Sequence, residues 1–152
     1  NLAFYAGVYG VREKSAVERT LALVGLSENP STLTRSLSAG WRQRLALGIA
    51  LVHAPKLLFL DEPTSGVDPV ARREFWTRID ALAEGGVTVL VTTHFMEEAE
   101  YCDRLAIMAA GEILALGTPS AIKASAATAA NPEPDMEDAF IALIQRREAA
   151  AP

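Results

Sequence analysis

The sequence has one cysteine, two histidines and no apolar run long enough to cross a membrane. With only Cys102, the chain cannot form an internal disulfide, which favours a reducing compartment and a packing role for this thiol. The longest apolar run, residues 45–60, is interrupted at His53 and Pro55 and falls short of the roughly 20 residues that a spanning helix needs. We therefore predict no transmembrane segment.

Clustered basic residues are also lacking. The formal net charge is -5, and Lys and Arg are scattered along the chain. Because neutralising nucleic-acid phosphates requires clustered positive charge, we predict no nucleic-acid partner. An initiator methionine and a charged leader are missing as well, since "NLAFYAGVYG" begins inside an apolar periodic segment. We expect residue 1 to be a cut end.

What the sequence does contain is the pattern of one α/β domain. Apolar periodicity predicts two short helices joined around Gly10, and a helix from Ser38 to about Val52 that is buried nearly all round. "LLFLDE" and "VTVLVTT" read as buried strands of a parallel sheet, the first covered on both faces. Between them, Asp68 and Pro69 begin a helix that ends at Gly85. Strand, helix and strand in this order predict a parallel crossover.

The remaining sequence predicts a small C-terminal assembly. "DRLAIMAAGEILALG" is typical of a hairpin that turns at Ala110 and Gly111, and a short helix follows near Pro119. "ASAATAANPEPD" is of low complexity and is expected to be mobile. Asp135 then caps a last helix that turns Met136 and other apolar residues inward.

Asp61 and Glu62 stand at the carboxyl end of the first predicted strand, where open α/β sheets bind ligands. One of two adjacent side chains can face a metal while the other faces a water, although for the pair taken alone a simple strand-ending turn is the more common explanation. His94 follows the second strand and is expected at the same edge, as a catalytic or a loop residue. At "LSAGWRQR", Ser38 and Gly40 begin a helix, which suits either an anion site or an ordinary N-cap.

Taken together in this order, these segments resemble the ABC-type ATPases over residues 1–120. "LSAGWRQRLALGIAL" is similar to the signature segment of that family, "LLFLDEP" to its Walker B strand, "SGVDP" to its D-loop and "TTHFMEEAE" to its switch-histidine segment. The resemblance implies a C-terminal part of a P-loop ATPase core plus the helical subdomain. It divides the chain into a partial ATPase domain (1–122, with the helical subdomain at 1–54 and the catalytic-core half at 55–122), a flexible linker (123–134) and a C-terminal helix and tail (135–152).

The resemblance also implies roles for single residues, with ATP and Mg²⁺ as cofactors. Asp61 would hold Mg²⁺ through water, Glu62 would polarise the attacking water, and His94 would contact the γ-phosphate. Three residues that begin the signature helix would contact ATP bound to an opposite subunit, and a D-loop residue would couple the two sites: these are Ser38, Ala39, Gly40 and Asp68.

Two departures from the family pattern stand out. Ala39 replaces the usual glycine and Trp41 the frequent glutamine, and a methyl group at position 39 could crowd the phosphate unless its φ is negative. The loop G-x-x-x-x-G-K-[ST] is absent, because "GVREKS" has Glu13 where glycine is required. We expect that loop upstream of Asn1, and we expect the 152-residue chain alone to be inactive.

The end of the sequence, "GTPSAIKA" followed by "MEDAFIALI", resembles ATPase subunits that serve exporters of the ABC-2 type. This implies an ATP-hydrolysing transporter subunit that is cytoplasmic and peripheral on the inner face of the membrane. Its partners would be transmembrane permease subunits and a second ATPase domain. The alternatives are a soluble ABC ATPase outside transport, and a non-enzymatic module that docks on a membrane partner.

Overall fold

The computed structural model describes residues 1–28 and 31–150 of the 152-residue sequence. The chain forms two compact units, an N-terminal unit (Asn1–Thr92) and a C-terminal unit (Thr93–Pro152). Parts of the predicted helical subdomain and tail fall on residues 29–30 and 151–152, which lie outside the described residues. The functional boundaries predicted after residues 54, 122 and 134 stay predictions.

In the first half of the N-terminal unit, the described residues form the helices α1 (Leu2–Val8), α2 (Lys14–Leu23) and α3 (Ala39–Leu51), and the 3₁₀ turn η1 (Thr34–Ser36) precedes α3. As predicted, α1 and α2 join around Gly10, whose φ of 74° lies in the left-handed region that favours glycine. Gly48 lets α2 approach α3, because a Cβ there would stand 3.4 Å from the side chains of Thr20 and Val24. Leu2, Ala6 and Val52 form the buried centre of this helical layer.

Helix α3 is buried almost all round, as predicted. Among its residues, only Arg42 and Ala46 are exposed, and they lie one turn apart on a single stripe. The helix ends at Leu51, one residue before the predicted end at about Val52, which is its C-cap. Such a helix can serve as a rigid support because neighbours restrain it on several sides.

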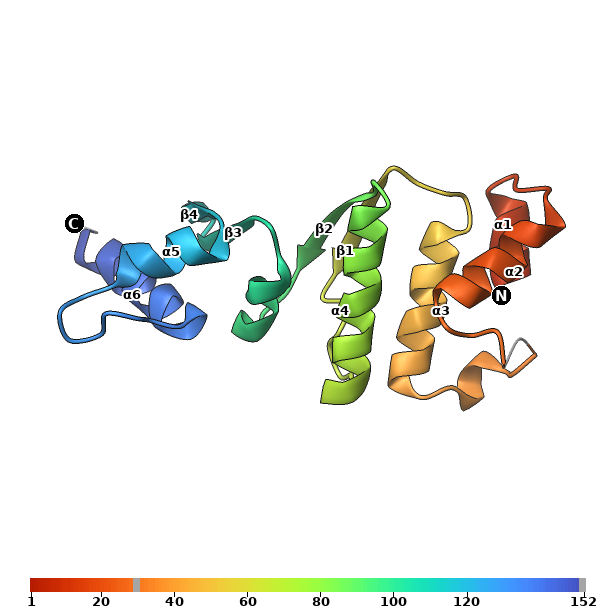
Figure 1. Ribbon diagram of the computed structural model, residues 1–152, viewed down its shortest axis with the longest axis horizontal. Helices are drawn as coiled ribbons and strands as arrows, with labels where there is room; N and C mark the ends of the chain where they lie inside the picture. The colour runs from red at the N-terminus through yellow and green to blue at the C-terminus, as the bar shows by residue number, and fades with distance from the viewer. Residues whose placement is uncertain (29–30, 151–152) are drawn as a thin grey trace. The chain divides into compact units, whose positions relative to one another are not determined.

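The second half of the unit is the predicted strand–helix–strand crossover. Strands β1 (Leu57–Asp61) and β2 (Thr88–Thr92) pair in parallel, with Asp61 opposite Thr92 in register. Helix α4 (Pro69–Glu84) joins them and buries Phe75, Trp76, Ile79 and Leu82. Figure 1 shows α4 running alongside the two strands within this unit.

The prediction that the two strands are fully buried is wrong. Leu57 and Phe59 of β1 are 48% and 67% exposed, and Leu90 of β2 is 56% exposed, whereas Leu58 on the other face is 4% exposed. Successive strand residues point to opposite faces, so the exposed leucines and phenylalanine share one face. Among the described residues, helix α4 covers one face of the strand pair, and the other face is exposed.

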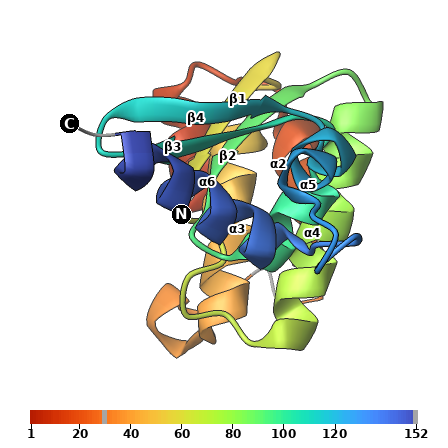
Figure 2. The ribbon, with the colours of Figure 1, turned by 90° about the vertical axis from the view of Figure 1, so that its left-hand side faces the viewer.

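The C-terminal unit contains the 3₁₀ segment η2 (Met96–Tyr101), strands β3 (Leu105–Ala109) and β4 (Glu112–Gly117), and helices α5 (Pro119–Ala126) and α6 (Met136–Ala150). The strands form the predicted antiparallel hairpin. Its turn residues Ala110 and Gly111 have φ values of 48° and 80°, as a two-residue hairpin turn with two positive φ angles requires. Both α5 and α6 contact β4 (Figure 2).

The core of this unit includes the end of α5. Ile122 and Ala126, one turn apart on α5, are both buried with Ile107, Met136 and Ala139. Because both residues enter the core, the helix continues through residue 126, and the first four residues of the predicted linker 123–134 are helical. The cap of α6 is confirmed, since the backbone N–H of Asp138 donates to Asp135 Oδ1 at 2.8 Å.

Candidate active site of the strand and helix ends

The last residue of β1, Asp61, is fixed by the last residue of β2. The hydroxyl of Thr92 donates a hydrogen bond to Asp61 Oδ1. The carboxylate stays exposed at the strand end, so one oxygen is anchored while the group remains open to a ligand. The predicted placement of Asp61 at the carboxyl edge of a parallel sheet is confirmed.

Glu62 follows with an unusual backbone. Its φ is +42°, in the left-handed region where a non-glycine residue costs of order 1–3 kcal/mol. Its backbone N–H donates to both the carbonyl oxygen of Thr92 at 3.0 Å and the Thr92 hydroxyl at 3.1 Å. These bonds hold the chain in the left-handed turn, which abruptly ends the extended course of β1.

The turn leads directly to Asp68. Pro63, Thr64 and Val67 are buried beneath it, so the turn is anchored from below. Asp68 is the N-cap of α4, and its Oδ1 accepts hydrogen bonds from the backbone N–H groups of Val70 and Ala71 at 3.1 and 3.0 Å. Asp68 therefore caps α4. The coupling role that the resemblance implies for Asp68 stays a prediction.

Ser38 caps α3 in the same manner, as its Oγ accepts from the Trp41 backbone N–H at 3.4 Å. Ala39 begins the helix and is not among the described residues with positive φ. The φ of Ala39 is therefore negative, as an uncrowded phosphate approach requires, and its methyl group points as in any helix. Ala39 therefore preserves the helix start despite replacing the usual glycine.

Gly40 brings the starts of α3 and α4 together. It is buried, and a Cβ built on it would lie 3.0 Å from the Ala71 Cβ and 3.7 Å from Val67 Cγ1. Both helices begin at the same end of the N-terminal unit (Figure 1). Four of the predicted site residues, Ser38, Ala39, Gly40 and Asp68, therefore belong to two neighbouring helix starts.

One turn further along, an ion pair joins the same two helices. The Arg44 guanidinium of α3 donates to Glu74 of α4, and the Arg44 side chain is only 11% exposed. Burial lowers the pKa of Arg44 from its usual value, and the nearby positive charge of Arg78 lowers this pKa further. An arginine remains charged at neutral pH even so, and the pair locks α3 against α4.

His94 is the remaining predicted site residue. It belongs to the C-terminal unit, two residues after β2 ends at Thr92. Its imidazole contacts the Phe95 ring, with centroids 4.2 Å apart and planes inclined by 36°. The expected meeting of His94 with Asp61 and Glu62 at one edge stays a prediction.

Sequence reasoning missed Thr92. A threonine that ends a strand is an ordinary β-former, and nothing in its immediate sequence marks it. The signal lay in the register: in a parallel pair of five-residue strands, the final residues "D" and "T" stand opposite each other. Counting both strands back from their ends would have paired Thr92 with Asp61.

Comparison with known proteins now decides the family. The family described as "ABC transporter" matches residues 5–65, which include the α3 start and the acidic pair. The "Probable multidrug ABC transporter ATP-binding protein YbhF" of Escherichia coli is 52% identical over 147 residues. This chain belongs to the ABC transporter ATP-binding domains. The match spans 95% of this chain but 25% of that relative's length.

Other ABC transporter proteins agree in sequence and fold. The "Linearmycin resistance ATP-binding protein LnrL" of Bacillus subtilis is 41% identical over 78% of this chain and 39% of its own length. A solved "ATP binding subunit of ABC transporter" superposes with a TM-score of 0.74 and 26% identity, over 94% of this chain and 60% of that one. The fold is thus that of an ABC ATPase domain, as the sequence predicted.

Residues 1–28 and 31–150 contain no group of three or more His, Cys, Asp or Glu side chains that could hold a metal ion. A Mg²⁺ site does not need such a group, because Mg²⁺ is usually bound by one or two carboxylates, waters and substrate phosphates. Asp61 supplies such a carboxylate. None of the described helices is both long and apolar enough to cross a bilayer.

Proposed function

We propose that this chain is the signature and Walker B portion of an ATP-hydrolysing ABC transporter subunit, with its phosphate-binding loop supplied by residues outside these 152. The observation that carries the proposal is the acidic pair, in which Thr92 anchors Asp61 and a left-handed backbone turns Glu62 away from the strand. That conformation costs free energy for a non-glycine residue, and the hydrogen bonds from the Glu62 backbone N–H to Thr92 hold it in place.

The two carboxylates would have different roles. Asp61 would bind Mg²⁺ through water, and the ion when bound neutralises phosphate charge and orients the nucleotide. Glu62, on its own side of the turn, would accept a proton from the attacking water as general base. Thr92 holds the Asp61 carboxylate and the Glu62 main chain, so both groups are positioned before the proton moves.

The helix starts would serve a second nucleotide. Backbone N–H groups at the start of α3 and the positive end of its dipole favour a phosphate. We assign Ser38, Ala39 and Gly40 to the γ-phosphate of ATP held by an opposing ATPase domain. Asp68, on the adjacent helix start, would couple the two sites, because Gly40 packs directly against Ala71 beside it. His94 would contact the γ-phosphate of the chain's own site.

The chain's partners would be transmembrane permease subunits, at the inner face of the cell membrane. Support comes from relatives: one solved neighbour is described as "Part of the ABC transporter complex cbiONQ" and is 32% identical over 72% of this chain. An export role is suggested by relatives named for multidrug and linearmycin resistance, and by the human "Phospholipid-transporting ATPase ABCA3", 41% identical over 80% of this chain.

The test is phosphate release from Mg-ATP by a longer chain that contains these residues and a G-x-x-x-x-G-K-[ST] loop. Sustained turnover is expected, and no turnover would favour the non-enzymatic docking module. The 152-residue chain alone is the control. It has no cradle for the β-phosphate, so calorimetry should detect little Mg-ATP binding, and micromolar affinity would contradict the assignment of the loop to other residues.

A further inference from the structure

Glu98 is a buried carboxylate to which none of the roles above is assigned. It lies in η2, and its exposed fraction is 0%. Burying an ionisable side chain costs free energy unless its oxygens accept hydrogen bonds. Glu98 Oε2 accepts one of 2.6 Å from the hydroxyl of Thr93. The buried carboxylate is thereby joined to the residue that precedes His94.

The same hydroxyl shapes the turn around His94. Thr93 Oγ1 accepts a hydrogen bond of 3.0 Å from the Phe95 backbone N–H, so Thr93 and Phe95 close a short turn with His94 at its centre. A hydroxyl has one proton to donate and two lone pairs to accept with. Because Thr93 gives its proton to Glu98, its lone pairs are left to face the Phe95 amide. Glu98 therefore orients the hydroxyl that closes the turn.

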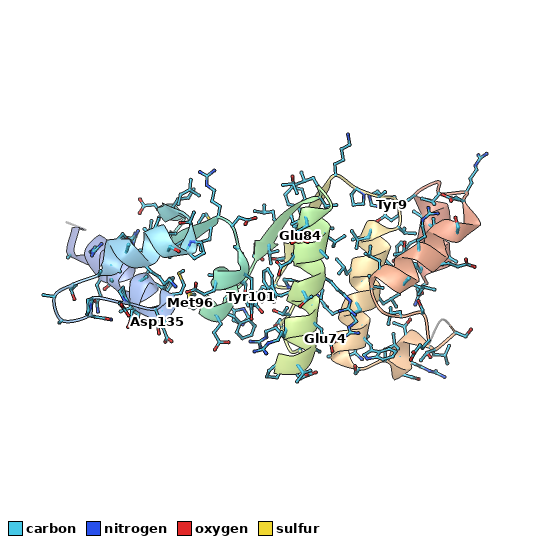
Figure 3. All side chains as sticks on the ribbon, viewed as in Figure 1. Tyr9, Glu74, Glu84, Met96, Tyr101 and Asp135 are labelled. Atoms are coloured by element: carbon cyan, nitrogen blue, oxygen red, sulfur yellow. The ribbon has the colours of Figure 1, made fainter. Side chains whose placement is uncertain are left out.

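The segment that carries Glu98 is itself held firmly. Met96 and Ala99, on either side of it in sequence, pack against the core of the C-terminal unit, and η2 contacts α6. Figure 3 labels Met96 and Tyr101, the two ends of η2. Phe95 donates its backbone N–H to the turn, and its ring contacts the His94 imidazole. Backbone and ring of His94 are thus restrained from the same anchored segment.

We propose that Glu98 and Thr93 are positioning residues that hold His94 in the orientation needed to contact the γ-phosphate. This inference rests on the proposed function, and it adds two residues to the site. We assign neither residue a contact with nucleotide, because their hydrogen bonds act on the turn around His94. The packing of η2 against the core of the C-terminal unit then determines the orientation of the His94 side chain.

The first test replaces the Thr93 hydroxyl in the longer, ATP-hydrolysing chain. Thr93→Val keeps the shape of the side chain but removes the hydroxyl, whereas Thr93→Ser keeps the hydroxyl. Misplacing a catalytic group by about 1 Å can cost on the order of 100-fold, so we expect Thr93→Val to lower kcat about 10- to 100-fold. KM for Mg-ATP should change less than about twofold, and Thr93→Ser should stay near wild type. A wild-type kcat for Thr93→Val would overturn the inference.

The second test asks whether Thr93 acts through His94. Residues that work as one unit give non-additive effects in a double-mutant cycle. In a chain that already carries His94→Ala, adding Thr93→Val should therefore cause little further loss of kcat. An equal fold-loss in both backgrounds would mean that Thr93 supports the fold rather than the histidine, and would refute the proposal.

Glu98 is tested by the pair Glu98→Gln and Glu98→Ala. The glutamine oxygen can still accept from Thr93, so we expect most of kcat to survive in Glu98→Gln and to be lost in Glu98→Ala. Because Glu98→Ala leaves a cavity that threatens folding, the outcome is decided by Glu98→Gln and the Thr93 variants. Glu62→Gln is assayed alongside. If it turns over at the wild-type rate, the proposed function fails and this inference with it; if it is inactive while Thr93→Val is normal, only this inference fails.

Discussion

Thr92 and Asp61 end two parallel strands directly opposite each other, and the Thr92 hydroxyl donates to the Asp61 carboxylate. The same hydroxyl accepts from the Glu62 backbone N–H at 3.1 Å. One side chain therefore fixes both acidic residues, the first through its carboxylate and the second through its main chain. This relationship sets the geometry from which the proposed chemistry follows.

Removing that hydroxyl should impair hydrolysis more than it impairs folding. Thr92→Val preserves a β-branched strand residue but frees the Asp61 carboxylate and weakens the hold on the Glu62 turn. We expect kcat to fall by about 10-fold or more, with Thr92→Ser close to wild type. Steady-state phosphate release on the longer chain measures both variants. Equal activity of Thr92→Val and Thr92→Ser would show that the hydroxyl has no part in the site.

Ser38→Arg should damage the neighbouring domain's site and spare its own. The α3 start would present its N–H groups to a phosphate held by the opposing domain, and a long cationic side chain there would block the approach. Mixed dimers with one altered chain, and nucleotide trapped at each site separately, provide the measurement. Ser27→Arg places the same change at an exposed turn position that is not part of a helix start, and it serves as the control. Loss restricted to the altered chain's own site would refute the assignment to the opposite nucleotide.

Gly40→Ala should destabilise the chain although alanine favours helices. The added methyl group would meet the Ala71 Cβ at 3.0 Å, which forces the starts of α3 and α4 apart. We expect a loss of about 1–3 kcal/mol in the free energy of unfolding, measured by urea titration. Gly7→Ala is the matched control, since nothing lies within 4 Å of its added Cβ, and should stabilise by about 0.5–1 kcal/mol. A second substitution, Ala71→Gly, should restore part of the loss; no loss in Gly40→Ala would mean that the helix starts are not tightly apposed.

Much of the fold was predictable because its signals are local. Apolar period, the Asp68–Pro69 start and the Ala110–Gly111 turn each fix an element within a few residues, and all three are confirmed. The exposure of Leu57, Phe59 and Leu90 was not predictable in this way. An apolar strand reads as buried from its composition, yet its burial depends on which layers the rest of the chain places over each face.

The site was predictable as a set of residues but only partly as a geometry. The strand-end position of Asp61 and the capping by Ser38 and Asp68 follow from sequence. The left-handed turn at Glu62 and the bond from Thr92 do not, because both depend on pairing between residues about 30 positions apart. The link from Glu98 to Thr93 was hidden for another reason: an acidic residue in "MEEAE" reads as solvent-exposed, and only packing in the C-terminal unit buries it.

The most direct measurement of the central claim is the hydrolysis rate of Glu62→Gln in the longer chain, alongside its nucleotide-dependent dimerisation. Glutamine preserves size and hydrogen bonding but lacks a basic oxygen, so Mg-ATP should still bind and hold the dimer closed. General-base contributions are typically about 10²- to 10⁴-fold, and we predict a loss of kcat within that range. Hydrolysis at the wild-type rate would contradict the account, because residues 61–63 would then be only the end of a strand.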